Sequence, residues 1–459
     1  MKYSFAFAVL FMAQFVVGQD KFQKIDSLLS SLYAAKKING NFLIAESGKV
    51  IYKQSFGYAD EETKEKLNEN SVFELASVSK QFTATAIMIL KEKKLLRLED
   101  DFTKYIPELS YYKGITIRNL LNHTGGLPDY EEVMDTIFDK NKIATNKDII
   151  AVFSEHRPKI LFEPNTKYEY SNTGYALLAS IIEKVSGLSY ADFLDTHIFQ
   201  PLQMNNSFVY NRRLLPKKIS NYAFGYVYSD SLKNYLLPDD LAQTNMVIWL
   251  DGIVGDGCVN STINDLLKWD RALYSNKLLS KSGMKAVFKV ATLNDNAKTK
   301  YGFGWQIDDN PDYGKIVSHG GGWPGYVSYI DRHIKNDKTI IMLQNHDDVT
   351  IPITSIRSIL YNESMLNNNK ITLSKDQLQK FAGIYELNPS FQIEVALQND
   401  HLFAMTSGQP SVELFAETEN SFIIKEIGAQ VVFNLNRDGT VKSLTFSQGG
   451  NQMEGKKIR

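Results

Sequence analysis

Ser77-Val78-Ser79-Lys80 places a hydroxyl and an amine three positions apart, just before apolar residues at helical spacing. These apolar residues run from Phe82 to Leu95 and predict a helix. On a helix, side chains three positions apart share one face, about one turn apart. A serine hydroxyl is a weak nucleophile until a base lies beside it, and lysine can be that base when its pKa is lowered. The segment therefore predicts an acyl-transfer site at the start of a long helix.

The same Ser-x-x-Lys spacing occurs at Ser110–Lys113 and at Ser282–Lys285, and we interpret both occurrences as accidental. The first lies between a proline and a glycine that leave no room for a helix, and the second contains Gly283. Only Ser77 precedes a long amphipathic helix, whose free backbone N–H groups can polarise an acyl oxygen.

Tyr170-Ser171-Asn172 is the second candidate for a catalytic role. It precedes a predicted helix over Tyr175–Val185, so we expect it to lie on a loop. Its phenol can relay a proton to a leaving group, and its carboxamide can hold an acyl chain. The tripeptide recurs as Tyr274-Ser275-Asn276, after a predicted helix over Ile263–Leu273. We interpret that second copy as a structural turn.

His319-Gly320-Gly321-Gly322 is the third element, and it precedes an apolar strand pattern. Glycines allow the backbone of a bound substrate to approach a strand closely. A backbone N–H in this segment can complete an oxyanion hole with the N–H of Ser77, and one such donor contributes about 3 kcal/mol in the transition state.

Together these elements resemble the serine β-lactamase and penicillin-binding-protein family, in particular its class C-like branch. That branch includes D-alanyl-D-alanine carboxypeptidases, D-aminopeptidases and esterases, and it has tyrosine where class A members have the serine of Ser-Asp-Asn. The resemblance covers about residues 22–365. Further matching segments are Leu121–Pro128, Tyr170–Gly187, Gly255–Gly257, Ser261–Trp269 and Tyr301–Trp305.

The resemblance implies a role for each matching residue. Ser77 would be the nucleophile, Lys80 its base and Tyr170 the proton relay. The implied substrate-binding residues are Asn172, His319, Gly321 and Gly322, with the N–H groups of Ser77 and Gly322 forming the oxyanion hole. Many β-lactamases have lysine where His319 stands, and a histidine is only partly charged near neutral pH. The sequence therefore favours a peptidase or esterase over an efficient β-lactamase.

Strand patterns at both ends of residues 22–366, with helices between them, predict an α/β domain of the β-lactamase/transpeptidase-like type. A hairpin is predicted over Asn41–Glu46 and Lys49–Phe56, and further strands over Gly302–Ile307, Tyr326–Asp331 and Thr339–Gln344. A last helix is predicted over 351–366. We expect one mainly antiparallel sheet, assembled from distant segments and flanked by helices, plus a helical region.

The pattern changes after the polar linker at residues 367–370. Short strand-like runs then follow every 9 to 11 residues and predict an up-and-down barrel over residues 375–459, similar to lipocalin-like domains. These runs are 381–387, 391–397, 401–406, 412–416, 422–426, 430–434, 442–446 and 453–459.

The composition and the N-terminal residues lead to further expectations about binding partners, disulfides and localisation. The net charge of −1 over 459 residues offers no electrostatic case for nucleic acid, and the lone Cys258 cannot form an intramolecular disulfide. Lys2 and the apolar run up to Val17 predict a signal peptide over residues 1–18, and hence a secreted or periplasmic protein with no integral membrane segment after cleavage. We expect a small-molecule or peptide substrate and no metal or other cofactor; the sequence leaves the oligomeric state open.

Two other functions compete with a Ser-Lys hydrolase. An α/β-hydrolase can carry His-Gly-Gly-Gly, but this chain lacks the Gly-x-Ser-x-Gly nucleophile motif. A catalytically weak or inactive binding or sensor protein of the penicillin-binding type is the other alternative, and the fact that all three motif positions are filled argues against it.

Overall fold

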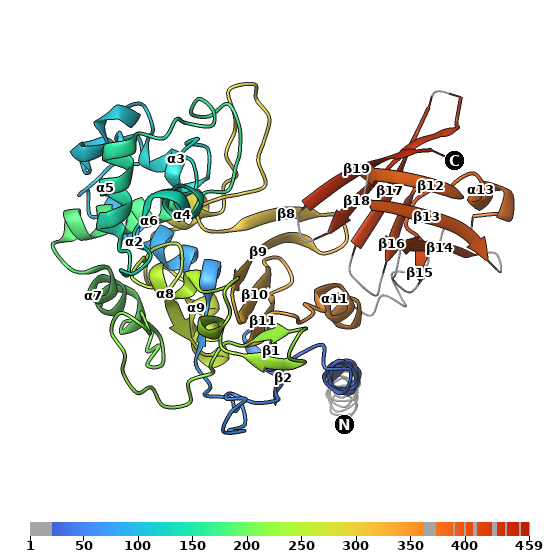
Figure 1. The fold of residues 1–459 in the computed structure, drawn as a ribbon, viewed down its shortest axis with the longest axis horizontal. Coiled ribbons are helices and arrows are strands. Elements are labelled where there is room, and N and C mark those ends of the chain that lie inside the picture. The colour runs from blue at the N-terminus through green and yellow to red at the C-terminus, as the bar shows by residue number, and fades with distance from the viewer. Residues whose placement is uncertain are drawn as a thin grey trace, which may run out of the picture. The chain divides into compact units, whose positions relative to one another are not determined.

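The computed structural model describes residues 21–361, 373–388, 391–398, 401–406, 411–424, 429–436, 438–448 and 451–458 (Figure 1). Contacts divide the chain into two compact units. The larger spans Leu29–Val349, and the smaller joins Thr350–Arg459 to the start of the chain. The signal peptide and the linker at 367–370 lie outside the described residues, and the domain limits 22–366 and 375–459 stay predictions. Within the described residues, no helix is long and apolar enough to cross a membrane.

The larger unit is built on a six-stranded antiparallel sheet in the order β2-β1-β11-β10-β9-β8. The predicted hairpin is confirmed: β1 spans Gly40–Glu46 and β2 spans Lys49–Phe56. β1 also pairs with β11, Lys338–Gln344, with Phe42 opposite Met342. Segments about 300 residues apart therefore form the centre of the sheet, as the strand patterns at the two ends of the domain predicted.

The strands beside the site differ in detail from the prediction. The strand expected at Gly302–Ile307 is instead β8, Gln306–Asn310, because residues 302–305 form a tight turn. Gly304 has φ +75° in this turn, and a Cβ there would lie 2.7 Å from the carbonyl oxygen of Lys80. The glycine segment at 319–322 lies within β9, Gly314–Trp323, and it precedes the predicted apolar strand, which is β10, Tyr326–His333. The two strands pair with each other.

Helix α2, Lys80–Glu92, is almost entirely buried and follows a single 3-10 turn at Ala76–Ser79. Its Phe82 packs against Phe199 and Trp269, with ring centroids 5.5 and 4.5 Å away. The helix ends three residues before the predicted Leu95, because Lys94 adopts φ +60°. Helix α6, Asn172–Ser186, packs beside α2 and stops at Gly187, whose left-handed φ of 74° suits glycine.

The other helices of the larger unit surround α2 and α6 or lie on the sheet (Figure 1). They are α3 Ile117–Leu121, α4 Tyr130–Ile137, α5 Asn146–His156, α7 Tyr190–Leu194, α8 Met246–Trp249, α9 Ile263–Ala272 and α10 Lys281–Val287. Short strands complete the unit: β3 Phe73–Glu74, β4 Phe208–Val209, β5 Val227–Ser229, β6 Asn234–Leu236 and β7 Val259–Ser261. One expectation is wrong: a 3-10 helix, Pro107–Tyr112, does fit around Ser110.

The smaller unit contains a closed antiparallel barrel in which β12 to β19 pair in chain order. The strands are β12 Gly383–Asn388, β13 Phe391–Gln398, β14 His401–Thr406, β15 Val412–Ala416, β16 Ser421–Ile424, β17 Ala429–Leu435, β18 Val441–Gln448 and β19 Asn451–Lys457. Phe381, Tyr385, Phe422 and Phe433 pack in its core. Helices α11, Ile353–Tyr361, and α13, Lys375–Gln379, also belong to this unit. The predicted fold class, an α/β domain followed by an all-β barrel, is confirmed.

Candidate active site

Ser77 and Lys80 contact each other at the start of α2. The Nζ atom of Lys80 donates to Ser77 Oγ at 3.0 Å, to Asn172 Oδ1 at 2.9 Å and to the backbone oxygen of Asp256 at 3.0 Å. Because Lys80 is fully buried, these contacts employ all three protons that an ammonium group can donate. The hydroxyl and the amine of the Ser-x-x-Lys segment are therefore adjacent in space as well as on the helix.

The turn that carries Ser77 is held under backbone strain. Ala76 has φ +47°, an uncommon value for a residue with a side chain. Leu75 N–H donates to Val259 O at 2.8 Å on one side of the turn, and Val259 N–H donates to Ser79 Oγ at 3.1 Å on the other. Strain of this kind persists only where neighbouring contacts over-determine the conformation. Strand β7 supplies those contacts and fixes the direction of the Ser77 side chain.

Asn172 is the first residue of α6 and is held at both ends of its amide. Its Oδ1 accepts from Lys80, and its Nδ2 donates to Glu131 Oε1 at 3.2 Å. Its backbone N–H donates to Asp129 Oδ2 at 3.2 Å. The preceding Ser171 caps the helix by accepting from Gly174 N–H. The helix start therefore places the amide of Asn172 between the lysine and a carboxyl group.

Tyr170 lies above the lysine and is fixed from both sides by His123. The ammonium of Lys80 is 4.9 Å from the centre of the Tyr170 ring. His123 accepts from Glu169 N–H through its backbone oxygen and from Ser171 N–H through Nδ1, at 3.0 and 3.1 Å. Its ring also lies 4.3 Å from that of Tyr170. His123 thus holds the residues on either side of the phenol through hydrogen bonds.

His123 can accept the hydrogen bond from Ser171 N–H because its ring is neutral. Burial, followed by the charge of Lys80, lowers the pKa of His123 well below its usual value. A neutral ring whose Nδ1 accepts a hydrogen bond must carry its proton on Nε2. That atom has no hydrogen-bond partner among the described residues, and the ring is surrounded by the aromatic rings of Tyr175 and Tyr301.

His319 is uncharged, so the expectation that it is partly charged near neutral pH is wrong. The side chain is buried, and burial together with the charge of Lys80 lowers the pKa of His319 to about 3. Its Nδ1 lies 2.6 Å from Gly320 O, and its Nε2 lies 2.7 Å from the hydroxyl of Tyr301. A neutral ring satisfies this arrangement by donating from Nδ1 and accepting at Nε2. His319 therefore offers no positive charge to a substrate carboxylate.

The glycines after His319 bring β9 against the Ser77 turn. A Cβ on Gly321 would lie 2.3 Å from Leu75 O and 3.0 Å from Ser77 N, so only glycine fits there. Gly322 has open space where its Cβ would be, and it lines the same cavity as Ser77. Strand β8 pairs with β9 only as far as Ser318, so one edge of β9 has no strand partner beyond that residue within the described part of the chain.

The cavity in front of Ser77 is lined by three acidic side chains. Burial raises the pKa of Glu74 to about 7, although Arg213 opposes the shift. Burial and then Asp129 raise the pKa of Glu131 to about 7. Burial also raises the pKa of Asp256, whose Oδ2 accepts from the hydroxyl of Tyr130 at 2.9 Å. The cavity is therefore acidic, with two carboxyl groups that titrate near neutral pH.

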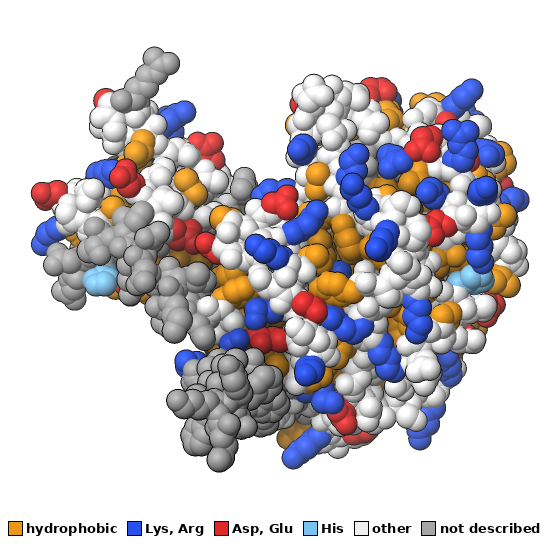
Figure 2. Space-filling model, turned by 180° about the vertical axis from the view of Figure 1, so that it is seen from behind, with side chains coloured by type: hydrophobic (Ala, Val, Ile, Leu, Met, Phe, Trp, Pro, Cys, Tyr) orange, Lys and Arg blue, Asp and Glu red, His pale blue; other side chains and the backbone are white. Residues whose placement is uncertain are grey.

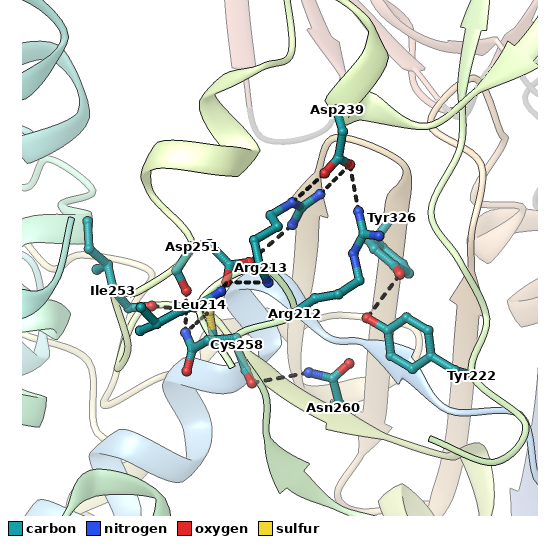
Figure 3. Close-up of polar contacts among 11 residues, drawn as sticks. Arg212, Arg213, Leu214, Tyr222, Asp239, Asp251, Ile253, Cys258, Asn260 and Tyr326 are labelled. Carbon is teal, nitrogen blue, oxygen red and sulfur yellow. Dashed lines mark hydrogen bonds and ion pairs between the residues drawn. The ribbon is translucent and has the colours of Figure 1, made fainter. Parts of the chain in front are cut away.

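A polar network fixes the loop that forms the far wall of this cavity (Figure 3). Asp251 accepts from the backbone N–H groups of Arg213 and Leu214, at 2.8 Å each, and from Arg213 Nη1 at 3.1 Å. The thiol of Cys258 donates to Ile253 O at 3.1 Å, and both residues line the cavity. Burial raises the pKa of Cys258 well above its usual value, so the thiol stays protonated at neutral pH. Cys258 therefore contributes a protonated thiol to the cavity wall.

The structure brings all seven residues singled out from the sequence to one place, and it adds others that the sequence reading missed. Three of these residues lie within segments already noted for their resemblance: His123 in 121–128, Asp256 in 255–257 and Tyr301 in 301–305. Glu74 and Glu131 are three residues before Ser77 and three after Pro128, positions at which no spacing rule singles out a carboxyl group. Their raised pKa values follow from burial in the cavity beside Ser77.

The other two Ser-x-x-Lys segments lie on the surface. Ser110 is exposed in its 3-10 helix. Ser282 and Lys285 are both exposed on α10, and Ser282 Oγ is 2.9 Å from Ser280 Oγ. The second Tyr-Ser-Asn follows α9 as a turn. None of these residues lines the Ser77 cavity.

This fold and the Ser-Lys cavity define the class of β-lactamase/transpeptidase-like serine hydrolases. The chain belongs to the Beta-lactamase family, whose model matches residues 25–350, and a domain of unknown function, DUF3471, matches residues 367–458. The resemblance inferred from the three sequence elements is confirmed.

Comparison with individual named proteins extends the similarity over both units of the chain. The chain is 40% identical to "Penicillin-binding protein 4*" of Bacillus subtilis (strain 168) over 444 residues, which cover 95% of this chain and 98% of the relative. The octameric penicillin-binding protein homologue from Pyrococcus abyssi superposes with a TM-score of 0.65 at 24% identity, covering 94% of this chain and 99% of the homologue. The D-amino acid amidase from Ochrobactrum anthropi SV3, complexed with D-phenylalanine, has a TM-score of 0.60 at 24% identity and covers 76% of this chain and 99% of its own.

Proposed function

We propose that this chain is a secreted or periplasmic serine hydrolase that cleaves an amide bond through an acyl-enzyme at Ser77. The observation that carries the proposal is the 3.0 Å contact between Lys80 Nζ and Ser77 Oγ at the wall of a cavity. A buried amine beside a hydroxyl is the arrangement that activates a serine nucleophile. Small esters remain chemically accessible to the same nucleophile.

In the proposed reaction Lys80 acts as the base. Nζ first releases one proton to solvent and becomes a neutral amine, after which the hydrogen bond reverses and Ser77 Oγ donates to Nζ. Oγ then bonds to the acyl carbon while its proton passes to Nζ. Tyr170 carries a proton from Lys80 to the leaving amine, whose C–N bond breaks, and water repeats the sequence on the acyl-enzyme. The side chain of Tyr170 is 37% exposed, so a bound substrate can reach it for this relay.

The backbone N–H groups of Ser77 and Gly322 are the proposed oxyanion hole. Gly321 supports this role because its missing side chain lets β9 approach the Ser77 backbone. The unpaired edge of β9 beyond Ser318 supports a second role, in which an extended substrate aligns beside the strand. Asn172 is proposed to bind the acyl portion of the substrate. His319 is proposed to support the site through its hydrogen bond with Tyr301.

The acidic cavity points to a substrate with a positively charged amino group near the scissile bond. A substrate ammonium beside Glu131 would favour the ionised carboxylate and return its pKa toward the usual range. A substrate carboxylate would instead be repelled by the acidic side chains of the cavity, and the neutral His319 would not offset that repulsion. The amidase likeness fits this choice, because D-phenylalanine carries an α-ammonium. We therefore favour amides of amino acids or amino-terminal D-residues over β-lactams.

Glu131→Gln should separate charged from neutral substrates. For D-phenylalanine p-nitroanilide with a free amino group, we expect KM to rise about 30-fold, because a desolvated partner of the ammonium is lost. The N-acetylated anilide should change less than about threefold. The amide oxygen introduced by this substitution can still accept from Asn172, so the site geometry is retained. Glu132→Gln, an exposed neighbour, is the matched control and should change neither substrate.

The pH dependence gives an independent check of the same prediction. A raised pKa of about 7 means that Glu131 is protonated below neutral pH and ionised above it. Binding of the free amine should therefore strengthen from pH 5 to pH 7, then weaken as the substrate amine loses its proton near pH 8. KM for the acetylated anilide should show no such rise and fall. Equal KM changes for both anilides in Glu131→Gln would contradict the assignment.

His123→Ala should lower kcat for the amide at least about tenfold with little change in KM, because Ser171 N–H loses its acceptor and Tyr170 its packing partner. His123→Asn should recover much of that loss, since the asparagine Oδ1 can replace Nδ1 and asparagine tolerates the φ of +60°. His123→Gln, whose acceptor is one bond too far, is the matched comparison. Equal kcat values for the three variants would show that His123 serves folding alone.

A further inference from the structure

A second cavity of the larger unit lies where the turn after α9, helix α10 and the end of β10 meet. We name it the Arg332 pocket, and its polar wall residues are Tyr274, Ser275, Asn276, Lys281, Lys285 and Arg332. It shares no lining residue with the Ser77 cavity. Gly322 pairs with Val327 on β10, and Arg332 lies five residues further along that strand, about 17 Å away. The pocket is therefore a separate place on the same sheet.

The Arg332 pocket is cationic. Three positively charged side chains line it and, of the described residues, no aspartate or glutamate does. Lys281 and Lys285 are spaced i, i+4 on α10, so they occupy one face, and neither has an acidic partner in the described part of the chain. Two like charges at this spacing repel each other slightly. Figure 2 shows that Lys and Arg side chains occur at many places on one face of the larger unit, whereas Lys281, Lys285 and Arg332 line a single cavity.

The guanidinium of Arg332 is buried and incompletely paired. Its side chain is 1% exposed, and Nε and Nη2 donate to the carboxylate and the backbone oxygen of Asp270. Nη1 has no hydrogen-bond partner among the described residues. Asp270 is also shared with Arg271, so one carboxylate serves two guanidinium groups. A buried charged donor without an acceptor destabilises the protein, and an incoming oxyanion can supply the missing acceptor.

The rest of the pocket is apolar or aromatic. The Tyr274 ring lies 4.8 Å from Arg332 Cζ and the Phe288 ring 5.7 Å from it. Rings over the face of a guanidinium leave its in-plane N–H groups as the route to an acceptor. Met284 and Ile334, both half-buried, complete the wall. The pocket therefore combines an anion-binding end with an apolar surface.

We propose that the Arg332 pocket binds a small amphiphilic anion, whose carboxylate or phosphate group contacts Arg332, Lys281 and Lys285 while its apolar body lies against Phe288, Met284 and Ile334. Carboxylate and phosphate share the oxyanion geometry that guanidinium and ammonium groups recognise. The proposal is independent of the amide hydrolysis proposed for Ser77, because the two cavities have no wall in common.

Calorimetric titration of the full chain at low ionic strength tests this assignment with four probes that share one apolar body. Octanoate or octyl phosphate should bind saturably, and octan-1-ol and octylammonium should not. Saturation by one of the two anions alone also supports the proposal and identifies the preferred head group. Raising the salt concentration should weaken binding, because charges near the surface are screened.

The double variant Lys281→Gln/Lys285→Gln should bind at least about tenfold more weakly, as the loss of two surface charge contacts predicts. Lys277→Gln/Lys289→Gln removes the same charge from exposed positions outside the pocket wall and should bind like the unmodified chain. Equal weakening in both double variants, binding of octan-1-ol as tight as that of octanoate, or no saturation by either anion would overturn the proposal.

Discussion

Ser77→Ala is expected to lower hydrolysis of an amino-acid anilide or a short-chain ester by at least about 10⁴-fold, because no other described group in the cavity can form the acyl bond. Cys258 is the alternative nucleophile by position, but its thiol stays protonated and donates to Ile253 O. The same variant should lose all labelling by a fluorophosphonate probe. Intact-protein mass spectrometry would measure that labelling directly, with the adduct assigned to Ser77 in the unmodified chain.

Ser282→Ala is the matched control, because this serine has the same Ser-x-x-Lys spacing but is exposed on α10. It should retain both hydrolysis and labelling. Residual activity of Ser77→Ala near that of the unmodified chain would refute the assignment of the nucleophile. Labelling of Ser77 without turnover of any amide, ester or β-lactam would instead favour the alternative of a binding or sensor protein.

Lys80→Met has the second largest expected effect, a loss of at least about 10³-fold in the acylation rate. Methionine is similar in length and suits a buried position, but it cannot accept the proton of Ser77 Oγ. It also leaves Asn172 Oδ1 and Asp256 O without their donor. Burst-phase kinetics with a chromogenic ester would separate acylation from deacylation, and circular dichroism would verify that the fold is retained.

Lys80→Arg should fail almost as completely, because a guanidinium does not deprotonate at accessible pH and is too large for a fully buried ammonium site. Lys113→Met, at the exposed lysine of the Ser110–Lys113 segment, is the control and should leave acylation unchanged. A nearly normal burst with Lys80→Met would mean that another group is the base, with Tyr170 the nearest candidate at 4.9 Å from the lysine to its ring centre.

Strand patterns were the most reliable guide to the fold. The hairpin at residues 40–56 and the eight strands of the barrel lie within a few residues of their predicted positions, because alternation and turn residues are local properties. The segment at 302–305 was assigned wrongly to a strand because its apolar residues suit either state. The segment forms a turn because Gly304 packs closely against the backbone oxygen of Lys80. These two residues are 224 positions apart in the sequence.

The candidate site could be located from sequence because each of its elements is marked by residue type and spacing. Ser77, Lys80, Tyr170 and Asn172 belong to two short motifs, and the glycines after His319 mark a third. The acidic side chains could not be selected in the same way. Glu131 is chemically ordinary on the first turn of α4, and it acquires a pKa of about 7 only through burial beside Asp129 and Asp256.

The sequence by itself determined the position of the Ser77–Lys80 pair proposed as nucleophile and base, the antiparallel sheet with its helices and the following barrel, because periodicity and motif spacing depend on near neighbours along the chain. Only the tertiary structure decided the charge state of His319, the hydrogen bonds between His123 and the residues flanking Tyr170, and the acidity of the cavity. Each of these depends on burial and on Coulomb interactions between groups brought together from distant segments. Desolvation by surrounding atoms is a property of the packed chain, and residue order alone does not contain it.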